Sequence, residues 1–330
     1  MTVVTGFLGS GKTTLLGRVL SGPSTSNTAV LVNEFGEVGL DHHLLRRVDE
    51  RAVLLGSGCV CCTTREDLLE ALMDLLDLDQ RGDIPPLERV VVETTGLADP
   101  APILHTIFVD PVLQHHFAVD LVLTTVDAVN GHLHLDRNPE SVKQIAAADK
   151  VIVTKTDVAE RESVTGLLSR LRAINPSARV LEAAFGETDA GELFRPVGAG
   201  SHAGAVALAA EPHDVGETFS VSLTFDGSVD WTAFGVWLSM LLHARGEDVL
   251  RVKGMLDVGG EGPVVVNGVQ HTIHPPEHLD SWPDEDRTSR IVFITKGIPP
   301  EELLGSLEAF RGMLGARPAP LAAGQGVRSL

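Results

Sequence analysis

The feature that most constrains this chain is a glycine-rich string near its N-terminus, GFLGSGKT at residues 6–13. It fits the pattern GxxxxGK[ST], and it stands between a short apolar run and the start of a helical pattern. Glycines let the backbone N–H groups of such a loop converge on phosphates, and the dipole of the following helix favours the same anion. The string therefore predicts a strand, a phosphate-binding loop and a helix within an α/β fold.

We expect this loop and the first helical turn to make most of the contacts with the phosphates. Lys12 would reach the β- and γ-phosphates, and the hydroxyl of Thr13 would ligate Mg²⁺. The predicted phosphate-binding residues are Gly9, Ser10, Gly11, Lys12, Thr13 and Thr14.

A P-loop needs a second acidic group near the magnesium ion, at the end of another strand. The apolar segment RVVVE, residues 89–93, supplies it in Glu93, and Gly96 follows three residues later. Glu93 would hold Mg²⁺ through water, and the backbone amide of Gly96 would sense the γ-phosphate. Lys12, Thr13 and Glu93 are thus the predicted catalytic residues.

We expect the segment VIVTKTD, residues 151–157, to select the base of the nucleotide. It is similar to the guanine signature NKxD, with Thr in place of Asn. Asp157 would accept hydrogen bonds from guanine N1 and the exocyclic amine, a donor pair that adenine lacks. The stem of Lys155 would cover the face of the base, while Thr154 keeps only a hydroxyl in place of an amide. Residues 184–186, AFG, would complete the pocket, and the nucleotide is expected to be GTP or GDP.

All three cysteines of the chain lie close together, as Cys59, Cys61 and Cys62. An odd number in so short a segment cannot form a disulfide framework, and such clusters more often bind metal or act in redox chemistry. Thr63 and Glu66 fit a capping box, which places the thiols before a helix N-terminus whose dipole favours thiolates. Thiolates prefer soft or borderline ions, with Zn²⁺ the default. A buried apolar role and a redox switch are the alternatives.

The segment NEFGEVGLDHH, residues 33–43, contains further candidate metal ligands and follows the second expected strand. In a GTPase this part of the chain rearranges with the γ-phosphate. Glu34, Glu37 and Asp41 are candidate metal ligands or magnesium-sensing groups, although an ordinary polar loop explains each of them equally well. The fourth ligand of a three-thiolate site would be a water, a carboxylate or a side chain of a client protein.

Apolar runs and helical patterns alternate through the first half of the chain, which is typical of βαβ units and a parallel sheet. Asp99 and Asn138, each followed by proline, are read as helix N-caps. Helices are expected to begin at Lys12, Arg65, Pro100, Pro139 and Glu160. The expected strands are Thr2–Thr5, Thr28–Val32, Ala52–Leu55, Arg89–Glu93, Asp120–Val126, Val151–Thr154 and Arg179–Glu182.

The second half has a different pattern from the first. A stretch rich in Gly, Ala, Pro and His is followed by segments in which apolar and polar residues alternate, as in strands with one exposed face. The expected boundaries are 1–195 for a P-loop GTPase domain, 196–216 for a linker, 217–318 for a small α+β domain with an antiparallel sheet, and 319–330 for a tail. The strands expected there are Thr218–Phe225, Val249–Val258, Gly262–Asn267, Val269–His274 and Ser289–Thr295, with helices from Asp230 to Ala244 and from Pro300 to Met313.

The charge of the chain narrows the classes of partner. With 26 basic and 45 acidic residues, the net charge is −19. A charge of this sign repels nucleic acid and anionic lipid. The alternative interpretation is that the acidic residues only keep the protein soluble. No apolar run approaches the length of a membrane span, and the N-terminus does not read as a secretory signal. We therefore expect a cytoplasmic protein without nucleic-acid or membrane partners.

Five motifs, GFLGSGKTTLL, NEFGEVGLD, GCVCC, ETTGLADP and VTKTD, occur in the order seen in the CobW family of metal-related GTPases. Residues 251–255 and 289–294 resemble that family's C-terminal domain, so the resemblance extends over almost the whole chain. It implies a Ras-like α/β GTPase domain related to the nickel-insertion GTPases of urease and hydrogenase. It also implies metal binding at the three cysteines and delivery of zinc, cobalt or a related ion to a client protein.

Taken together, these features predict a GTP-hydrolysing metallochaperone that uses Mg²⁺ and carries Zn²⁺ or Co²⁺ to a metal-requiring client; a homodimer is a further expectation. Two other functions stay open. One is a non-enzymatic metal or redox sensor that binds nucleotide only as a switch, and the other is an ATP-using kinase or ATPase. Metal-stimulated GTP hydrolysis would favour the metallochaperone, nucleotide binding without turnover would favour the sensor, and a preference for ATP over GTP would favour the kinase or ATPase.

Overall fold

The computed structural model describes residues 1–20, 27–32, 53–54, 65–184, 189–195, 218–225, 227–283 and 285–313. The chain divides into two compact units. One contains Met1–Ser169 with Ala178–Val197, and the other contains Arg170–Ser177 with Gly198–Leu330. No helix in the described ranges is long and apolar enough to cross a membrane.

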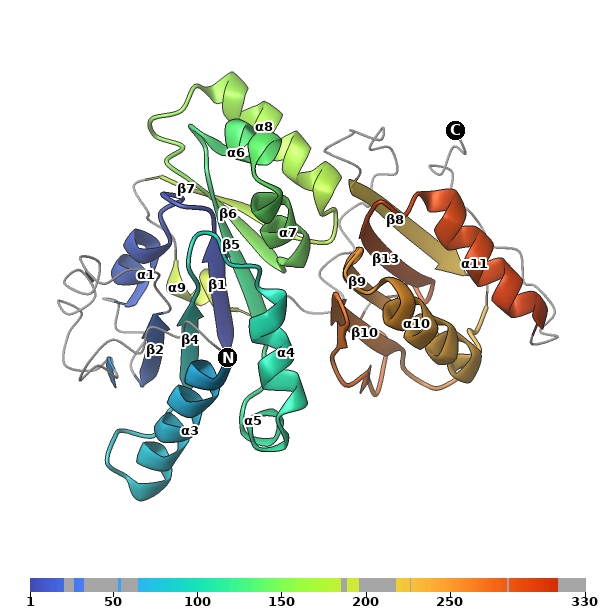
Figure 1. The fold of residues 1–330 in the computed structure, drawn as a ribbon, viewed down its shortest axis with the longest axis horizontal. Coiled ribbons are helices and arrows are strands. Elements are labelled where there is room, and N and C mark those ends of the chain that lie inside the picture. The colour runs from blue at the N-terminus through green and yellow to red at the C-terminus, as the bar shows by residue number, and fades with distance from the viewer. Residues whose placement is uncertain are drawn as a thin grey trace. The chain divides into compact units, whose positions relative to one another are not determined.

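The first unit is built on a seven-stranded sheet in the order β3-β2-β4-β1-β5-β6-β7, and every pairing is parallel. Strand β1 lies between β4 and β5, as Figure 1 shows. The strands are β1 (Thr2–Gly6), β2 (Thr28–Val32), β3 (Val53–Leu54), β4 (Arg89–Glu93), β5 (Leu121–Asp127), β6 (Lys150–Thr154) and β7 (Arg179–Ala183). The nearly continuous burial of β1, β5 and β6 is typical of a parallel sheet covered on both faces. The expected P-loop α/β architecture is confirmed.

Helices connect these strands, and most begin where the sequence predicts. Those expected at Lys12, Arg65 and Pro139 begin there, and the other two begin one residue late. Three short helices, α5, α6 and α9, were not expected, because fewer than eight residues do not establish a helical period. The helices are α1 (Lys12–Leu20), α3 (Arg65–Arg81), α4 (Ala101–Val109), α5 (Pro111–His116), α6 (Gly131–Arg137), α7 (Pro139–Ala147), α8 (Arg161–Ile174) and α9 (Ala190–Leu193).

The two expected N-caps differ from the prediction in detail. Pro100, not Asp99, is the N-cap of α4, although the carboxylate of Asp99 still accepts a hydrogen bond from the backbone N–H of Ala101 at 3.0 Å. Asn138 is the N-cap of α7, but its side chain makes no capping hydrogen bond. Its amide instead donates to the carbonyl of His134 at 3.3 Å, because α6 ends immediately before this residue and leaves that carbonyl within reach.

The register of the parallel strands brings several loops to one edge of the sheet. Val4 of β1 is level with Glu93 of β4, and Gly6 is level with Thr125 of β5. The loops after β1, β4, β5 and β6 therefore leave from the carboxyl edge, where parallel α/β folds bind their ligands. Beneath this edge, helix α1 packs Leu15 and Leu16 into a core with β1, β2, β4, β5 and β6.

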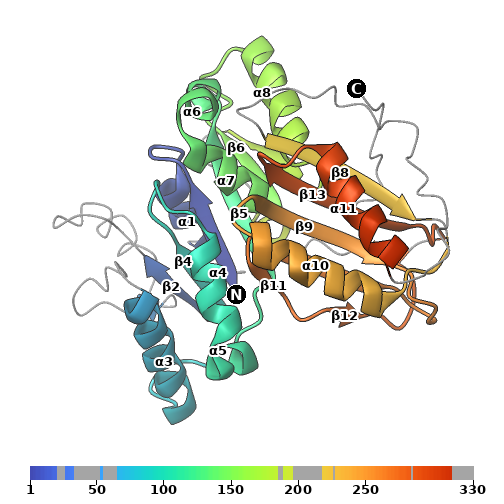
Figure 2. The same ribbon diagram turned by 45° about the vertical axis from the view of Figure 1, so that its right-hand side comes forward.

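The second unit has a six-stranded antiparallel sheet whose path runs β11-β10-β9-β13-β8, with β12 paired to β10. Helices α10 and α11 lie on one face of this sheet (Figure 2). The hydrophobic core includes Trp237 of α10 and Phe293 of β13. The elements are β8 (Thr218–Phe225), α10 (Trp231–Arg245), β9 (Val249–Leu256), β10 (Val264–Val269), β11 (Thr272–Ile273), β12 (Glu277–His278), β13 (Ser289–Lys296) and α11 (Pro300–Met313). Asp230 caps α10 as expected, by accepting a hydrogen bond from the N–H of Ala233 at 3.0 Å.

Several boundaries in the second unit differ from the prediction. Strand β9 ends at Leu256 instead of Val258, β10 begins at Val264 instead of Gly262, and the two-residue strand β12 was not predicted. The sequence predicts a break at Gly268, but β10 continues to Val269 and the chain turns at Gln270, which has a φ of 52°. The apolar alternation runs through the glycine, so the pattern alone did not reveal where the strand ends.

Candidate functional site

The glycine-rich string forms the turn between β1 and α1, as predicted. Its glycines are required by conformation, since Gly6, Gly9 and Gly11 have φ values of 140°, 71° and 90°. Gly6 is also required by space, because a Cβ there would lie 2.4 Å from the carbonyl oxygen of Thr125. A side chain would therefore be excluded by space at Gly6 and strained by backbone conformation at Gly9 and Gly11.

Lys12 folds back along this loop. Its Nζ donates hydrogen bonds to the carbonyl oxygens of Gly6 at 2.8 Å and Phe7 at 3.3 Å, and the residue is 8% exposed. The ammonium is therefore held against the loop backbone at the N-terminus of α1. An anion bound there would meet both this charge and the helix dipole.

Thr13 and Glu93 are in direct contact, although 80 residues separate them in the chain. The Thr13 hydroxyl donates to Glu93 Oε1 at 2.7 Å, and Glu93 is 3% exposed. This contact arises because β4 pairs with β1 and ends with Glu93 level with Val4, two residues before β1 ends and the P-loop begins. A hydroxyl and a carboxylate are the oxygen ligands that Mg²⁺ takes beside phosphates, so the pair fits the predicted magnesium site.

Gly96 lies against the P-loop. A Cβ at this position would meet the backbone nitrogen of Leu8 at 2.6 Å, so only glycine allows the loop after β4 to approach so closely. The N–H of Thr94 also donates to the carbonyl of Val4 at 2.9 Å, which keeps the start of this loop beside β1. The structure therefore brings together Lys12, Thr13, Glu93 and Gly96, as the sequence predicts.

The loop after β6 is attached to the P-loop by two side chains. Thr154 is 3% exposed, and its hydroxyl donates to the carbonyl of Ser10 at 2.7 Å. Lys155 has a φ of 58°, and its Nζ donates to the carbonyl of Gly9 at 2.7 Å. The hydroxyl of Thr154 thus tethers this loop to the P-loop, while Asp157, the predicted base-reading residue, is exposed in the turn that follows.

Asp127 belongs to the site, and sequence reasoning missed it. It is the last residue of β5, is 2% exposed, and accepts a hydrogen bond from Lys155 Nζ at 2.6 Å. Burial alone would raise its pKa, but hydrogen bonds from Lys155, Asn130 and the backbone of Val129 outweigh burial and hold that pKa below its ordinary value. The carboxylate is therefore charged and orients Lys155. The sequence carries a signal for it, an acidic residue at the carboxyl end of an apolar strand, but the predicted strand ended one residue earlier.

The predicted zinc or cobalt ligands and the further candidate ligands lie outside the described residues, and so do two residues of the expected base pocket. The undescribed candidates are Glu34, Glu37, Asp41, Cys59, Cys61, Cys62, Phe185 and Gly186. In the described part of the chain, no group of three or more His, Cys, Asp or Glu side chains could hold a metal ion. The thiolate site stays a prediction.

Comparisons with known proteins agree with this arrangement. Residues 1–182 match the CobW/HypB/UreG nucleotide-binding domain, and residues 219–311 match the C-terminal domain of the cobalamin synthesis protein cobW. The zinc chaperone YjiA of Escherichia coli is 35% identical over 317 residues, which cover 94% of this chain and 98% of YjiA. The zinc chaperone CobW of Pseudomonas aeruginosa is 31% identical over 337 residues, covering 89% of this chain and 86% of the relative.

A solved structure matches both halves of the chain. The crystal structure of Zn(II)-bound YjiA GTPase from E. coli superposes with a TM-score of 0.72 at 30% identity, covering 94% of this chain and 98% of that one. The resemblance seen in the motifs is thereby confirmed. The chain belongs to the CobW/HypB/UreG family of nucleotide-binding proteins and carries the CobW C-terminal domain.

Proposed function

We propose that this protein is a GTP-hydrolysing metallochaperone that carries Zn²⁺, or Co²⁺, to a metal-requiring client protein in the cytoplasm. The observation that carries the proposal is the contact between Thr13 and Glu93 beside Lys12, in a chain similar along nearly its whole length to a zinc chaperone. The first part of this observation supports phosphate chemistry. The second supports metal as the cargo.

Hydrolysis would depend on charge placed around the phosphates. Lys12, held against the loop backbone, would reach the β- and γ-phosphates, and Thr13 and Glu93 would hold Mg²⁺ directly and through water. When bound, Mg²⁺ would neutralise the charge that develops on the phosphate oxygens. We assign no side chain among the described residues to the attacking water, so we expect turnover of the protein alone to be slow.

Preference for guanine would come from the loop after β6. Two oxygens, the Gly9 carbonyl and the Asp127 carboxylate, fix the ammonium of Lys155, so the stem of this side chain is ordered before the base arrives. Asp157 would then accept the paired donors of guanine. Ordering the stem in advance lowers the entropic cost of binding.

Coupling between nucleotide and metal would run through the segments that contain the candidate ligands. Residues 33–52 begin after Val32 of β2, and Val32 is level with Glu93 in the sheet. Residues 55–64, which contain the cysteines, lie between β3 and α3. Both segments therefore start from strands on the Glu93 side of β1, where a bound γ-phosphate and Mg²⁺ would bias their conformation.

The experiment that tests the proposal is a titration of the purified protein with Co²⁺, followed by absorption spectroscopy. We expect one ion per chain and intense thiolate-to-metal charge transfer, which histidine and carboxylate sites lack. Replacing Cys61 and Cys62 with Ser should erase this absorption and leave GTP affinity nearly unchanged. Absence of charge transfer in the wild-type protein would contradict the thiolate site, and a preference for ATP in competition assays would contradict the GTPase.

A further inference from the structure

A buried glutamine contacts the loop that carries Gly96. Gln144 of α7 is 0% exposed, and its Nε2 donates hydrogen bonds to the carbonyl oxygens of Gly96 at 3.1 Å and Ala98 at 2.9 Å. Both N–H groups of one amide are therefore used on a single short loop. Because both acceptors are carbonyl oxygens, only a side chain with two donors can satisfy them.

The same loop is held from two other directions. Gly96 approaches the backbone of Leu8 so closely that a Cβ would lie 2.6 Å from its nitrogen. At the far end of the loop, Lys143 Nζ and Asp99 Oδ2 form an ion pair at 3.0 Å. Two successive residues of α7 and the P-loop thus determine where Gly96 lies.

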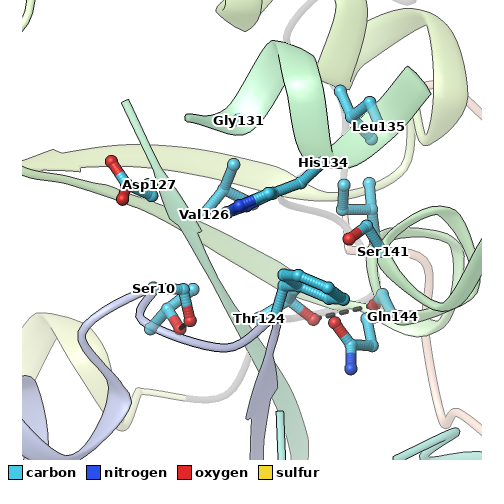
Figure 3. A pocket seen from close by; sticks show the side chains of 12 residues that line it. Ser10, Thr124, Val126, Asp127, Gly131, His134, Leu135, Ser141 and Gln144 are labelled. Atoms are coloured by element: carbon cyan, nitrogen blue, oxygen red, sulfur yellow. Dashed lines mark hydrogen bonds between the residues drawn. The ribbon is translucent and has the colours of Figure 1, made fainter. Parts of the chain in front are cut away.

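Gln144 is itself fixed to the sheet, which makes it a firm support. Its main-chain oxygen accepts a hydrogen bond from the hydroxyl of Thr124 at 2.8 Å, drawn as the dashed line in Figure 3. The next residue of β5, Thr125, contacts Ser10 of the P-loop through their hydroxyls at 2.6 Å. One strand therefore braces both the P-loop and the residue that holds the Gly96 loop.

The rest of the Gln144 side chain faces a small pocket behind the P-loop. Figure 3 shows Gln144 and Ser141, both on α7, with His134 among the other side chains that line this pocket. Phe7 lines it as well. Neither Gln144 Oε1 nor Ser141 Oγ has a hydrogen-bond partner within the described residues. The amide is thus anchored by its nitrogen alone. Among the described residues, the Gln144 side chain forms hydrogen bonds only with the Gly96 loop.

We propose that Gln144 is a positioning residue for the γ-phosphate: it holds the Gly96 loop against the P-loop so that the Gly96 amide is in place when GTP binds. This inference rests on the proposed GTPase function. GDP has no γ-phosphate for this amide to meet. Loss of Gln144 should therefore weaken binding of a GTP analogue and slow hydrolysis, while GDP binding stays the same.

The test compares Gln144→Met and Gln144→Glu with Ser141→Ala in the full-length protein. Methionine keeps the length of the side chain without donors, and Ser141→Ala removes a buried hydroxyl from the same helix and pocket without touching the loop. We expect kcat and the affinity for a non-hydrolysable GTP analogue to fall by about tenfold in Gln144→Met, as two lost hydrogen bonds imply. GDP affinity should change by less than about twofold, and Ser141→Ala should match the wild type.

The glutamate variant gives a readout that a merely structural role would not move. Two carbonyl oxygens facing the new carboxyl would raise its pKa, and the protonated form donates one hydrogen bond where the ionised form donates none. The hydrolysis rate of Gln144→Glu relative to wild type should therefore rise as the pH is lowered from about 8 to 6, while the ratio for Gln144→Met stays flat. The pH trend of Gln144→Glu relative to the wild type tests the positioning role even if the methionine variant fails to fold.

The inference is wrong if Gln144→Met or Gln144→Glu keeps the wild-type ratio of GTP-analogue to GDP affinity, or loses both affinities equally. The proposed function fails separately, if the wild-type protein binds no GTP or does not hydrolyse it. Wild-type hydrolysis with unchanged discrimination in the Gln144 variants would reject the positioning role alone.

Discussion

Two buried lysines lie at opposite edges of the same parallel sheet, and they differ in what surrounds them. Lys12 lies at the carboxyl edge, in a glycine-rich loop at a helix N-terminus, beside the Thr13–Glu93 pair. Lys150 begins β6 at the amino edge, and its Nζ donates to the carbonyl oxygens of Glu192, Leu193 and Arg195.

The difference teaches that burial of a cation does not by itself indicate a binding site. Lys150 ends in three carbonyls at and beyond the C-terminal end of α9, so its charge is used within the fold. Lys12 also donates to two carbonyl oxygens, those of Gly6 and Phe7, but it lies at the N-terminus of α1, next to the Thr13–Glu93 pair, where the helix dipole favours an anion. Substitutions at the two positions should therefore separate a lysine that binds a ligand from one that stabilises the fold.

The largest effect is expected at the phosphate site. Lys12→Ala should abolish GTP hydrolysis and largely abolish nucleotide binding, because no other described cation is placed to meet the β- and γ-phosphates. Isothermal titration with GDP and a phosphate-release assay measure both losses. Wild-type turnover in a folded Lys12→Ala protein would remove the P-loop assignment.

The opposite result is expected at the amino edge. Lys150→Met leaves three carbonyls without their donor, so the free energy of unfolding should fall by about 2–3 kcal/mol, whereas GDP affinity should stay near the wild-type value. Chemical denaturation and GDP titration measure the two quantities. A large loss of GDP affinity at unchanged stability would contradict the assignment of Lys150 to the fold.

Lys150 also predicts a pH dependence. Burial, followed by the nearby charge of Arg179, lowers its pKa from 10.5 to about 8. Between these values the unfolded chain binds the proton and the folded protein does not, so this group makes stability rise from pH 8 towards 10.5. The free energy of unfolding of the wild type, minus that of Lys150→Met, should increase over this window. A difference that does not increase would mean that the three carbonyls keep the ammonium charged over this window.

Base recognition should depend on Asp157. Asp157→Asn should weaken GTP binding by roughly 2–3 kcal/mol, the scale of losing charge-assisted hydrogen bonds, and should relax discrimination towards xanthine nucleotides. Competition with GTP, XTP and ATP measures this effect. Equal binding of ATP and GTP by the wild-type protein would show that the loop after β6 does not read guanine.

A smaller effect is expected from Asp127, which acts through Lys155. Asp127→Asn should weaken GTP and GDP alike by about 1 kcal/mol, because Lys155 loses its charged partner but keeps the carbonyl of Gly9. Glu160→Gln is a matched control, since it removes the same charge from an exposed position after the same loop. Equal effects of both substitutions would mean that only net charge matters.

How much the sequence predicts differs between the two edges of the sheet. Gly6, Lys12 and Gly96 are predictable because a glycine string and an acidic strand end allow few other structures. Asp127 was missed through a one-residue error in a strand boundary, and the three carbonyls at Lys150 come from a helix too short to show a period. Such contacts depend on which loops meet in space, and a single sequence does not contain that pairing.

In the proposed mechanism the nucleotide site and the metal site are coupled. This coupling is measured by the affinity for Zn²⁺ or Co²⁺ in the nucleotide-free, GDP-bound and GTP-analogue-bound states. We predict that the GTP analogue shifts metal affinity by roughly 5–150-fold, and that metal shifts the affinity for the analogue by the same factor. Identical metal affinities in all three states would contradict a nucleotide-driven metallochaperone, even if both ligands bind.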